Sequence, residues 1–210
     1  MRWLRHRDAD SIDDCLQDIR LFLKFVQKRE GRKKIFLVGH SFGGQLVLNL
    51  VSGAVNGLAG AIFSAPNIRL ALPVPLWKRL AAKWLSIFLP RLALGNELKP
   101  EDLSHDPDVI EAWKIDPQIQ TKITLRLGQL ILENQDRLPA LASQVRVPCL
   151  FMHGGDDPIC SPQGSKDFFK EVAAPDKTLK LYKGFYHEIF NEIGREKVFR
   201  DMEKWIDERI

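Results

Sequence analysis

The sequence has little cysteine, and the few thiols that it has are dispersed. Cys15, Cys149 and Cys160 form no Cys-x-x-Cys pair, so the 210 residues offer neither a disulfide framework nor a thiolate zinc site. An odd number of scattered thiols is typical of a reducing compartment. The charged residues at the start of the chain are not followed by the apolar stretch of a secretory signal. We therefore expect an intracellular, cytoplasmic protein.

A large excess of charge of one sign is also lacking. The 31 Lys and Arg residues outnumber the 27 Asp and Glu residues by four, and the two signs are mixed along most of the chain. This small surplus argues against a nucleic acid partner. With 45% hydrophobic and 28% charged residues, the composition excludes disorder and coiled coil and predicts a folded chain with one core.

One long segment has no charged side chain. Residues 35–68 contain no Asp, Glu, Lys or Arg over 34 residues, which is long enough to span a bilayer. Six glycines interrupt the segment, and so do His40, Gln45, Asn49 and Asn56, whose polar side chains are expensive in hydrocarbon. We interpret it as strand, tight turn, helix and strand, because buried parallel strands read as continuous apolar runs.

The remaining patterns alternate between strand and helix. Ser11 begins a helix as its N-cap, Asp14 lies near the capping-box position, and Gly31 ends the helix. Strands are expected at residues 35–38, 61–63, 149–152 and 178–182, and further helices at about 45–51, after Ser161-Pro162 and from about 195. This order predicts an α/β protein with a mostly parallel sheet flanked by helices.

The alternation stops between residues 67 and 146. This stretch shows no clear strand but at least two helical patterns, at about residues 75–89 and 118–134. We therefore expect residues 1–66 and 147–210 to form the α/β core, and residues 67–146 to form a helical cap inserted into it.

Residues 39–43, Gly-His-Ser-Phe-Gly, have the form G-x-S-x-G. The motif alone is weak, but here it directly follows an apolar strand and opens a helix. In that context the serine lies on a strained strand-to-helix turn, which exposes its hydroxyl at the carboxyl edge of the sheet. The pattern favours Ser41 as a nucleophile over a merely structural turn.

A serine nucleophile needs a base and an acid that orients the base. In such folds both follow the serine on loops after later strands. His187 and the neighbouring pair Asp156 and Asp157 occupy such loops. We predict His187 as the base and Asp157 as the acid, with Asp156 as the alternative. A metal site formed by His153 with these residues lacks a recognised ligand spacing, so we expect neither metal nor cofactor.

Three stretches resemble one known family. Residues 39–44 (Gly-His-Ser-Phe-Gly-Gly), 150–159 (Leu-Phe-Met-His-Gly-Gly-Asp-Asp-Pro-Ile) and 181–188 (Leu-Tyr-Lys-Gly-Phe-Tyr-His-Glu) look like the monoacylglycerol lipase and lysophospholipase branch of the α/β-hydrolases. Residues 80–95 also resemble that family's cap. The resemblance covers the chain from about Ser11 onward.

The resemblance implies an activity and a role for each site residue. A member of this branch is a serine hydrolase that cleaves the acyl ester of a monoacylglycerol or a lysophospholipid without a cofactor. Ser41 would be the nucleophile, Asp157 the acid and His187 the base. The backbone N–H of Phe42 would be one of two donors to the oxyanion.

The sequence departs from that family at its start. Family members carry, before the helix that begins here at Ser11, about half of the sheet and a His-Gly loop that supplies the second oxyanion donor. We therefore expect the N-terminal strands to be missing, residues 35–38 to form an apolar edge open to self-association, and ester hydrolysis to be slow. The alternative function is that of a catalytically poor hydrolase remnant that binds lipid or a partner.

The expected cap combines basic and apolar residues. No acidic residue occurs between positions 35 and 96, whereas basic residues punctuate an apolar stretch. Two interpretations stay open: a helix that serves an acyl chain and contacts an anionic membrane surface, or a helix packed over the core with a solvated basic face. The first interpretation assigns substrate binding to Trp77, Leu80, Trp84, Ile87 and Phe88.

Overall fold

A computed structural model describes residues 9–31 and 33–210, so the first residues of the expected core, 1–8, and residue 32 lie outside the described part. At the centre is a four-stranded sheet in the order β1, β2, β5, β6, in which every neighbouring pair is parallel. The strands are β1 (Ile35–His40), β2 (Leu58–Ser64), β5 (Cys149–Gly154) and β6 (Lys177–Tyr182). The predicted α/β fold with a mostly parallel sheet is confirmed, and each strand is longer than expected.

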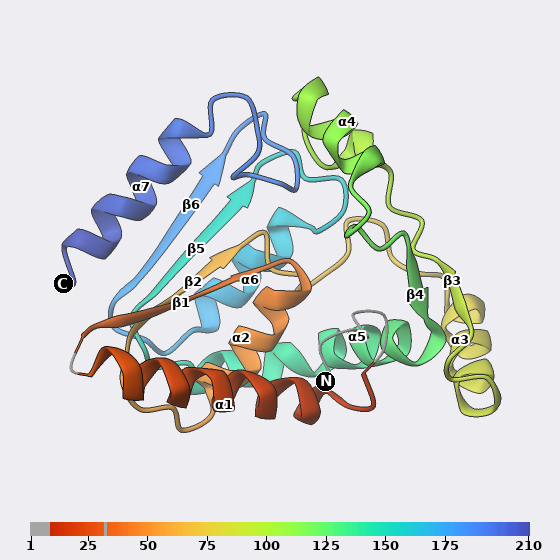
Figure 1. Cartoon of the computed structure of the whole chain (residues 1–210), viewed down its shortest axis with the longest axis horizontal. Coiled ribbons are helices and arrows are strands. Elements are labelled where there is room, and N and C mark those ends of the chain that lie inside the picture. The colour runs from red at the N-terminus through yellow and green to blue at the C-terminus, as the bar shows by residue number, and fades with distance from the viewer. Residues whose placement is uncertain (1–8, 32) are drawn as a thin grey trace.

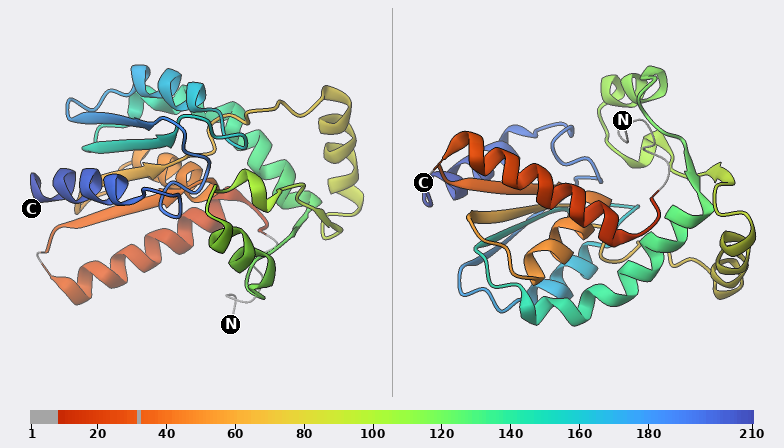
Figure 2. Two further views of the ribbon diagram at one scale, coloured as in Figure 1. Left: turned by 90° about the horizontal axis from the view of Figure 1, so that it is seen from above. Right: turned by 60° about the horizontal axis from the view of Figure 1, so that its bottom comes forward.

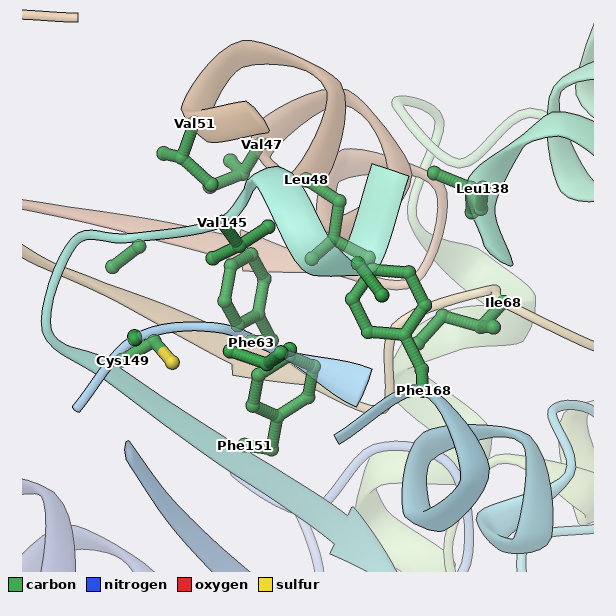
Figure 3. Packing of buried hydrophobic residues seen from close by; sticks show 14 residues of the cluster. Val47, Leu48, Val51, Phe63, Ile68, Leu138, Val145, Cys149, Phe151 and Phe168 are labelled. Atoms are coloured by element: carbon green, nitrogen blue, oxygen red, sulfur yellow. The ribbon is translucent and has the colours of Figure 1, made fainter. Parts of the chain in front are cut away.

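One face of the sheet is covered by α2 (Phe42–Ser52), α6 (Pro162–Glu171) and the short 3-10 helix η2 (Leu138–Gln144). Figure 3 shows the packing of this buried cluster. Phe63 and Phe151, from neighbouring strands, have ring centroids 4.5 Å apart, and Phe168 of α6 packs on Phe151 at 6.0 Å. This apolar layer fixes α2, and with it the turn that carries Ser41, against the sheet.

The opposite face is covered by α7 (Glu196–Asp207), which begins where the sequence predicts a closing helix. Val198 and Trp205 of α7 pack against strand residues that include Ile62 and Leu150. A Cβ atom on Gly60 would lie 2.6 Å from Cη2 of Trp205, so the glycine lets the helix approach the strand. Figure 1 shows α7 running beside β6.

Helix α1 (Ile12–Glu30) has the predicted ends. The Ser11 hydroxyl accepts the Asp14 N–H at 3.0 Å and donates to the Asp14 carboxylate at 2.8 Å. Gly31 follows the last turn at φ 68, a left-handed conformation that favours glycine. The helix packs beside α2.

The long uncharged run forms β1, α2 and β2, as interpreted from the sequence. None of the helices within residues 9–31 and 33–210 has the length and apolarity needed to cross a bilayer.

Strand β1 is an edge of the sheet. Among the described residues it pairs with β2 alone, and the Val38 side chain on it is 48% exposed. Leu21, Phe22 and Phe25 on the neighbouring α1 are also more than half exposed. The described part of the chain therefore has the apolar edge that the sequence predicts.

The chain between β2 and β5, expected to form a cap, extends beyond the carboxyl ends of the strands (Figures 1 and 2). Its elements are α3 (Leu76–Phe88), β3 (Ala93–Gly95), η1 (Pro100–Asp102), α4 (Pro107–Ile115), β4 (Lys122–Thr124), α5 (Leu125–Arg137) and η2. The helix expected at residues 75–89 is present as α3, whereas α4 was not expected.

Two expectations for this segment are wrong. It does contain strands, because β3 and β4 pair in antiparallel fashion. Each has three residues, which is too short for a periodic pattern. The helix expected from residue 118 begins instead at Leu125, because residues 122–124 pair with β3 and Thr124 caps α5 by accepting the Leu127 N–H.

The end of this segment is joined to the core. Leu138 and Ala142 of η2 are buried in the cluster under α2. The buried Gln45 side chain of α2 accepts a hydrogen bond from Asn134 of α5 at 2.9 Å and donates one to the Asn67 carbonyl at 2.6 Å. One side chain of α2 thus bonds to both an early and a late part of the inserted segment.

Candidate active site

Ser41 lies in the turn between β1 and α2, with the strained backbone that the motif predicts. Its φ of 51 and ψ of −120 are a conformation that side chains rarely adopt. The turn is held on both sides, because the Ser41 N–H donates to the Ser64 carbonyl at 3.0 Å and the Ser41 carbonyl accepts the Asn67 N–H at 3.0 Å. The strained conformation is therefore maintained by bonds to Ser64 at the end of β2 and to Asn67 just beyond it.

The glycines around Ser41 allow close packing of the turn. A Cβ on Gly39 would lie 2.6 Å from the Gly43 carbonyl oxygen, and one on Gly44 would lie 2.8 Å from Cβ of Pro66. A Cβ on Gly43 would meet nothing within 4 Å. A side chain at position 39 or 44 would clash with its neighbours, so both positions require glycine. Gly44 lies one residue beyond the G-x-S-x-G motif.

His187 and Asp157 form a buried pair. Nδ1 of His187 lies 2.8 Å from Oδ2 of Asp157. The other carboxylate oxygen, Oδ1, accepts the backbone N–H groups of Ile159 at 2.8 Å and Cys160 at 2.9 Å. The alternative acid, Asp156, instead accepts the Gly184 N–H at 2.7 Å. The structure thus brings Asp157, rather than Asp156, to the expected base.

A second histidine, His153, contacts the same carboxylate. Its Nε2 lies 3.0 Å from Oδ2 of Asp157, and its Nδ1 lies 2.8 Å from Oγ of Ser165. A carboxylate only accepts, so Nε2 carries the hydrogen and Nδ1 of the neutral ring accepts the Ser165 hydroxyl. From the sequence alone, His153 is given no role in orienting Asp157. The pattern that could have indicated this contact is a histidine near a strand end, four residues before Asp157.

The Asp157 carboxyl is held in its ionised form. Burial alone would raise its pKa, but the hydrogen bonds and charges of His153 and His187 outweigh burial and lower the pKa well below the ordinary value. An ionised carboxylate on Nδ1 leaves Nε2 of His187 free to accept a proton. The pair can therefore orient a general base.

Ser41 belongs to the same cluster of side chains. The ring of the preceding residue, His40, lies against the His187 ring with centroids 4.8 Å apart. Burial and the Asp157 charge raise the pKa of the Cys160 thiol, and a hydrogen bond with Ser41 opposes this rise. No hydrogen bond between Ser41 and His187 is present among the described residues, so that contact stays a prediction.

Phe42 is the first residue of α2. The N–H groups in the first turn of a helix have no partner within the helix, so the Phe42 N–H is available to a developing oxyanion. This role of Phe42 stays a prediction.

The residues predicted to bind an acyl chain all lie on α3, and none of them is buried. The exposed fractions are 68% for Trp77, 62% for Trp84 and 75% for Phe88. Leu80 and Ile87 are also more than half exposed. The helix packs on α5 and is not part of either buried cluster. The apolar surface of α3 thus faces outward.

The donor set for a metal is lacking in the described part of the chain. Within residues 9–31 and 33–210, no three His, Cys, Asp or Glu side chains are grouped so that they could hold an ion.

Comparison with known proteins places this geometry in a family. The chain is 33% identical over 204 residues to an uncharacterized abhydrolase domain-containing protein of Dictyostelium discoideum, covering 96% of this chain and 22% of that protein. It is 32% identical to phospholipase YtpA of Bacillus subtilis, covering 84% and 69%. The crystal structure of Paleococcus ferrophilus monoacylglycerol lipase superimposes with a TM-score of 0.88 at 29% identity, covering 98% of this chain and 78% of that one.

The chain spans about a fifth of the Dictyostelium relative and about two thirds of the phospholipase. The profile of the Hydrolase_4 family, described as "Serine aminopeptidase, S33", matches residues 5–194. The resemblance of the sequence to the monoacylglycerol lipase branch of the α/β-hydrolases is therefore confirmed, and the chain belongs to the Hydrolase_4 family.

Proposed function

We propose that this chain is a serine hydrolase that cleaves the carboxylic ester of a monoacylglycerol or a lysophospholipid. The observation that carries the proposal is the buried hydrogen bond between His187 and Asp157 in one cluster with the strained Ser41 turn. The names of the similar proteins, a phospholipase and a monoacylglycerol lipase, support an ester that carries a long acyl chain.

The proposed reaction has two halves. In the first, the Ser41 hydroxyl attacks the ester carbonyl, Nε2 of His187 takes its proton, and the Phe42 N–H donates to the carbonyl oxygen as it gains negative charge. The C–O bond to the alcohol then breaks, and the imidazolium returns the proton to the leaving oxygen. In the second half, water attacks the acyl-serine, its proton passes to His187, and Ser41 and a fatty acid are released.

A fluorophosphonate probe tests the nucleophile directly. We expect the parent chain to be labelled and the Ser41→Ala variant to be unlabelled, with Ser52→Ala as the control because Ser52 lies at the far end of α2. Equal labelling of the parent and Ser41→Ala would refute the assignment.

Substrate assays decide the reaction class. We expect hydrolysis of monooleoylglycerol or lysophosphatidylcholine, dependent on Ser41, and no release of nitroaniline from an alanine nitroanilide. Preferential release from the nitroanilide would place the chain with the aminopeptidases that give its family the description.

A membrane surface is the proposed source of such a substrate. The outward face of α3 is apolar, and Lys83 adds positive charge on the same helix. Such a helix suits the interface of an anionic bilayer, where long-chain esters reside.

We expect the double variant Trp77→Ala/Phe88→Ala to pellet less than the parent with phosphatidylglycerol vesicles. The control Ile115→Ala on α4, where Ile115 is 71% exposed, should pellet like the parent. Unchanged pelleting of the double variant would contradict membrane contact through α3.

The edge of β1 favours a second candidate function. An unpaired parallel edge with an exposed Val38 is a surface on which another strand can add. A chain that binds a partner there and hydrolyses no ester would correspond to the remnant considered from the sequence. The two functions separate on whether the parent chain hydrolyses a long-chain ester and whether Ser41→Ala abolishes that hydrolysis.

A further inference from the structure

One side-chain contact connects the nucleophile turn to the base loop through residues that sequence reasoning did not single out. His40 immediately precedes Ser41, and Glu188 immediately follows His187. Nε2 of His40 lies 3.1 Å from Oε1 of Glu188. Each partner is one peptide unit, about 3.8 Å between Cα atoms, from a catalytic residue of the proposed triad. The contact therefore joins the turn that carries Ser41 to the loop that carries His187.

The partners of His40 fix which ring nitrogen carries its proton. A carboxylate only accepts, so Nε2–H donates to Glu188. Nδ1 lies 3.1 Å from Oγ of Ser64, and in the neutral ring it accepts the Ser64 hydroxyl. Ser64 is fully buried at the end of β2, and its carbonyl accepts the Ser41 N–H. The ring is thus attached to the same residue that holds the nucleophile turn.

Glu188 is also held at more than one point. Its Oε2 accepts Nδ2 of Asn191 at 3.1 Å, and its backbone N–H donates to the Leu103 carbonyl at 2.8 Å. These bonds leave the carboxylate little freedom to turn away from His40. The contact between the two loops is therefore a fixed part of the site.

Charge is the second property of this contact. Burial opposes ionisation of Glu188, but the hydrogen bond from His40 and the charges of His40 and His187 lower its pKa to about 2. Glu188 is thus an anion throughout the neutral range. The charge of His187 thus acts on Glu188, and the same attraction acts between this anion and an imidazolium that forms at His187.

We propose that His40 and Glu188 are positioning residues, which fix the separation of Ser41 and His187 and stabilise the His187 imidazolium that forms when Ser41 gives up its proton. The inference deepens the proposed serine hydrolase function and rests on it. Asp157 orients His187 through Nδ1, and Glu188 adds a second carboxylate that reaches His187 through its charge and through the His40 ring.

Several other groups bear on the His187 charge and remain constant in the test. They are Asp157 on Nδ1, His153 and Cys160 next to Asp157, His40 against the ring, and Glu192 with His105 at the Tyr186 backbone and ring. Each is left intact in Glu188→Gln, so a change in the His187 pKa in that variant reports on Glu188.

Two substitutions separate charge from position. Glu188→Gln keeps an oxygen for His40 but removes the charge, and we expect the acidic limb of the kcat/KM profile to move down by about 0.5–1 pH unit while kcat falls about tenfold. His40→Gln keeps an amide donor for Glu188 and leaves the Glu188 charge in place, so we expect the acidic limb to stay where it is in the parent. We expect kcat to fall, because the His40 ring that helps to fix the separation of Ser41 and His187 is lost. KM should change little in both. The control Glu203→Gln, at an exposed site on α7, removes the same charge and should match the parent.

A nuclear magnetic resonance titration of the His187 imidazole gives a readout without turnover. We expect the His187 pKa to be lower in Glu188→Gln than in the parent and in Glu203→Gln. An unchanged His187 pKa, or an unchanged acidic limb in an active Glu188→Gln, would overturn the inference.

If the parent hydrolyses no ester, the proposed function fails, but the titration still decides whether Glu188 acts on the charge of His187. A cooperative melt of each variant shows that it is folded, and His40→Gln provides the second test should Glu188→Gln not fold.

Discussion

His153 and His187 bind the same oxygen atom of Asp157, at 3.0 and 2.8 Å. Two imidazoles from different loops thus converge on one buried carboxylate, whose other oxygen accepts two backbone N–H groups. The carboxylate is surrounded by donors, which explains why it stays ionised despite burial. The His153 ring therefore holds the carboxylate of the proposed acid, Asp157, by a second hydrogen bond.

Replacement of the acid should be far more damaging than replacement of its neighbour. In Asp157→Asn we expect kcat to fall by roughly 10³- to 10⁴-fold, because the amide cannot hold the required tautomer of His187. Asp156→Asn keeps an oxygen acceptor for the Gly184 N–H and should stay close to the parent. Ester hydrolysis measured for both variants checks this, and equal losses in the two would contradict the choice of Asp157.

Loss of His153 should give a pH-dependent change in stability. The folded pKa of Asp157 is lowered, so its contribution is present above the unfolded pKa of about 3.9 and is lost as the pH falls through the folded value. We expect His153→Leu to lower the free energy of unfolding by about 2–3 kcal/mol at neutral pH. This difference should shrink below about pH 4.

Urea denaturation between neutral and acidic pH measures this difference. Ser165→Ala keeps the bond between His153 and Asp157 and serves as the control, so its deficit should not depend on pH. A His153→Leu deficit that is constant across the pH range would show that packing alone explains it.

The strained nucleophile predicts a conflict between stability and activity. At φ 51, Ser41 adopts a conformation that glycine reaches without steric cost. Ser41→Gly should therefore raise the free energy of unfolding by about 1 kcal/mol relative to Ser41→Ala, although both variants lose the nucleophile. Chemical denaturation of the two variants side by side checks this, and equal stabilities would argue against strain at this turn.

The open edge of β1 should cause self-association. We expect light scattering after size-exclusion chromatography to show a mass that rises with concentration, because Val38 and its neighbours expose apolar surface at an unpaired edge. Val38→Lys should shift the population toward monomer. The control Leu72→Lys removes an 81% exposed apolar side chain outside the sheet and should not. A monomer at every concentration in the parent would contradict this expectation.

The sequence predicts the sheet, the nucleophile turn and the loops of acid and base because these depend on local order. Buried strands are continuous apolar runs, and the positions that follow them led to Asp157 and His187 as the predicted acid and base. The contacts of His153 and of Glu188 with His40 depend on how separate loops meet in space, which no local pattern encodes. The pairing of β3 with β4 was missed for a different reason, since a strand of three residues is too short to show a period.

The buried Gln45 side chain has a consequence for motion. It binds both Asn134 and the Asn67 carbonyl, and η2 is packed into the core below it. The two ends of the inserted segment are thereby tied to the helix that carries the nucleophile. We therefore expect any rearrangement around the proposed substrate to involve the outer elements α3, β3, α4 and β4, because the base of the insertion is bonded to the helix that follows Ser41.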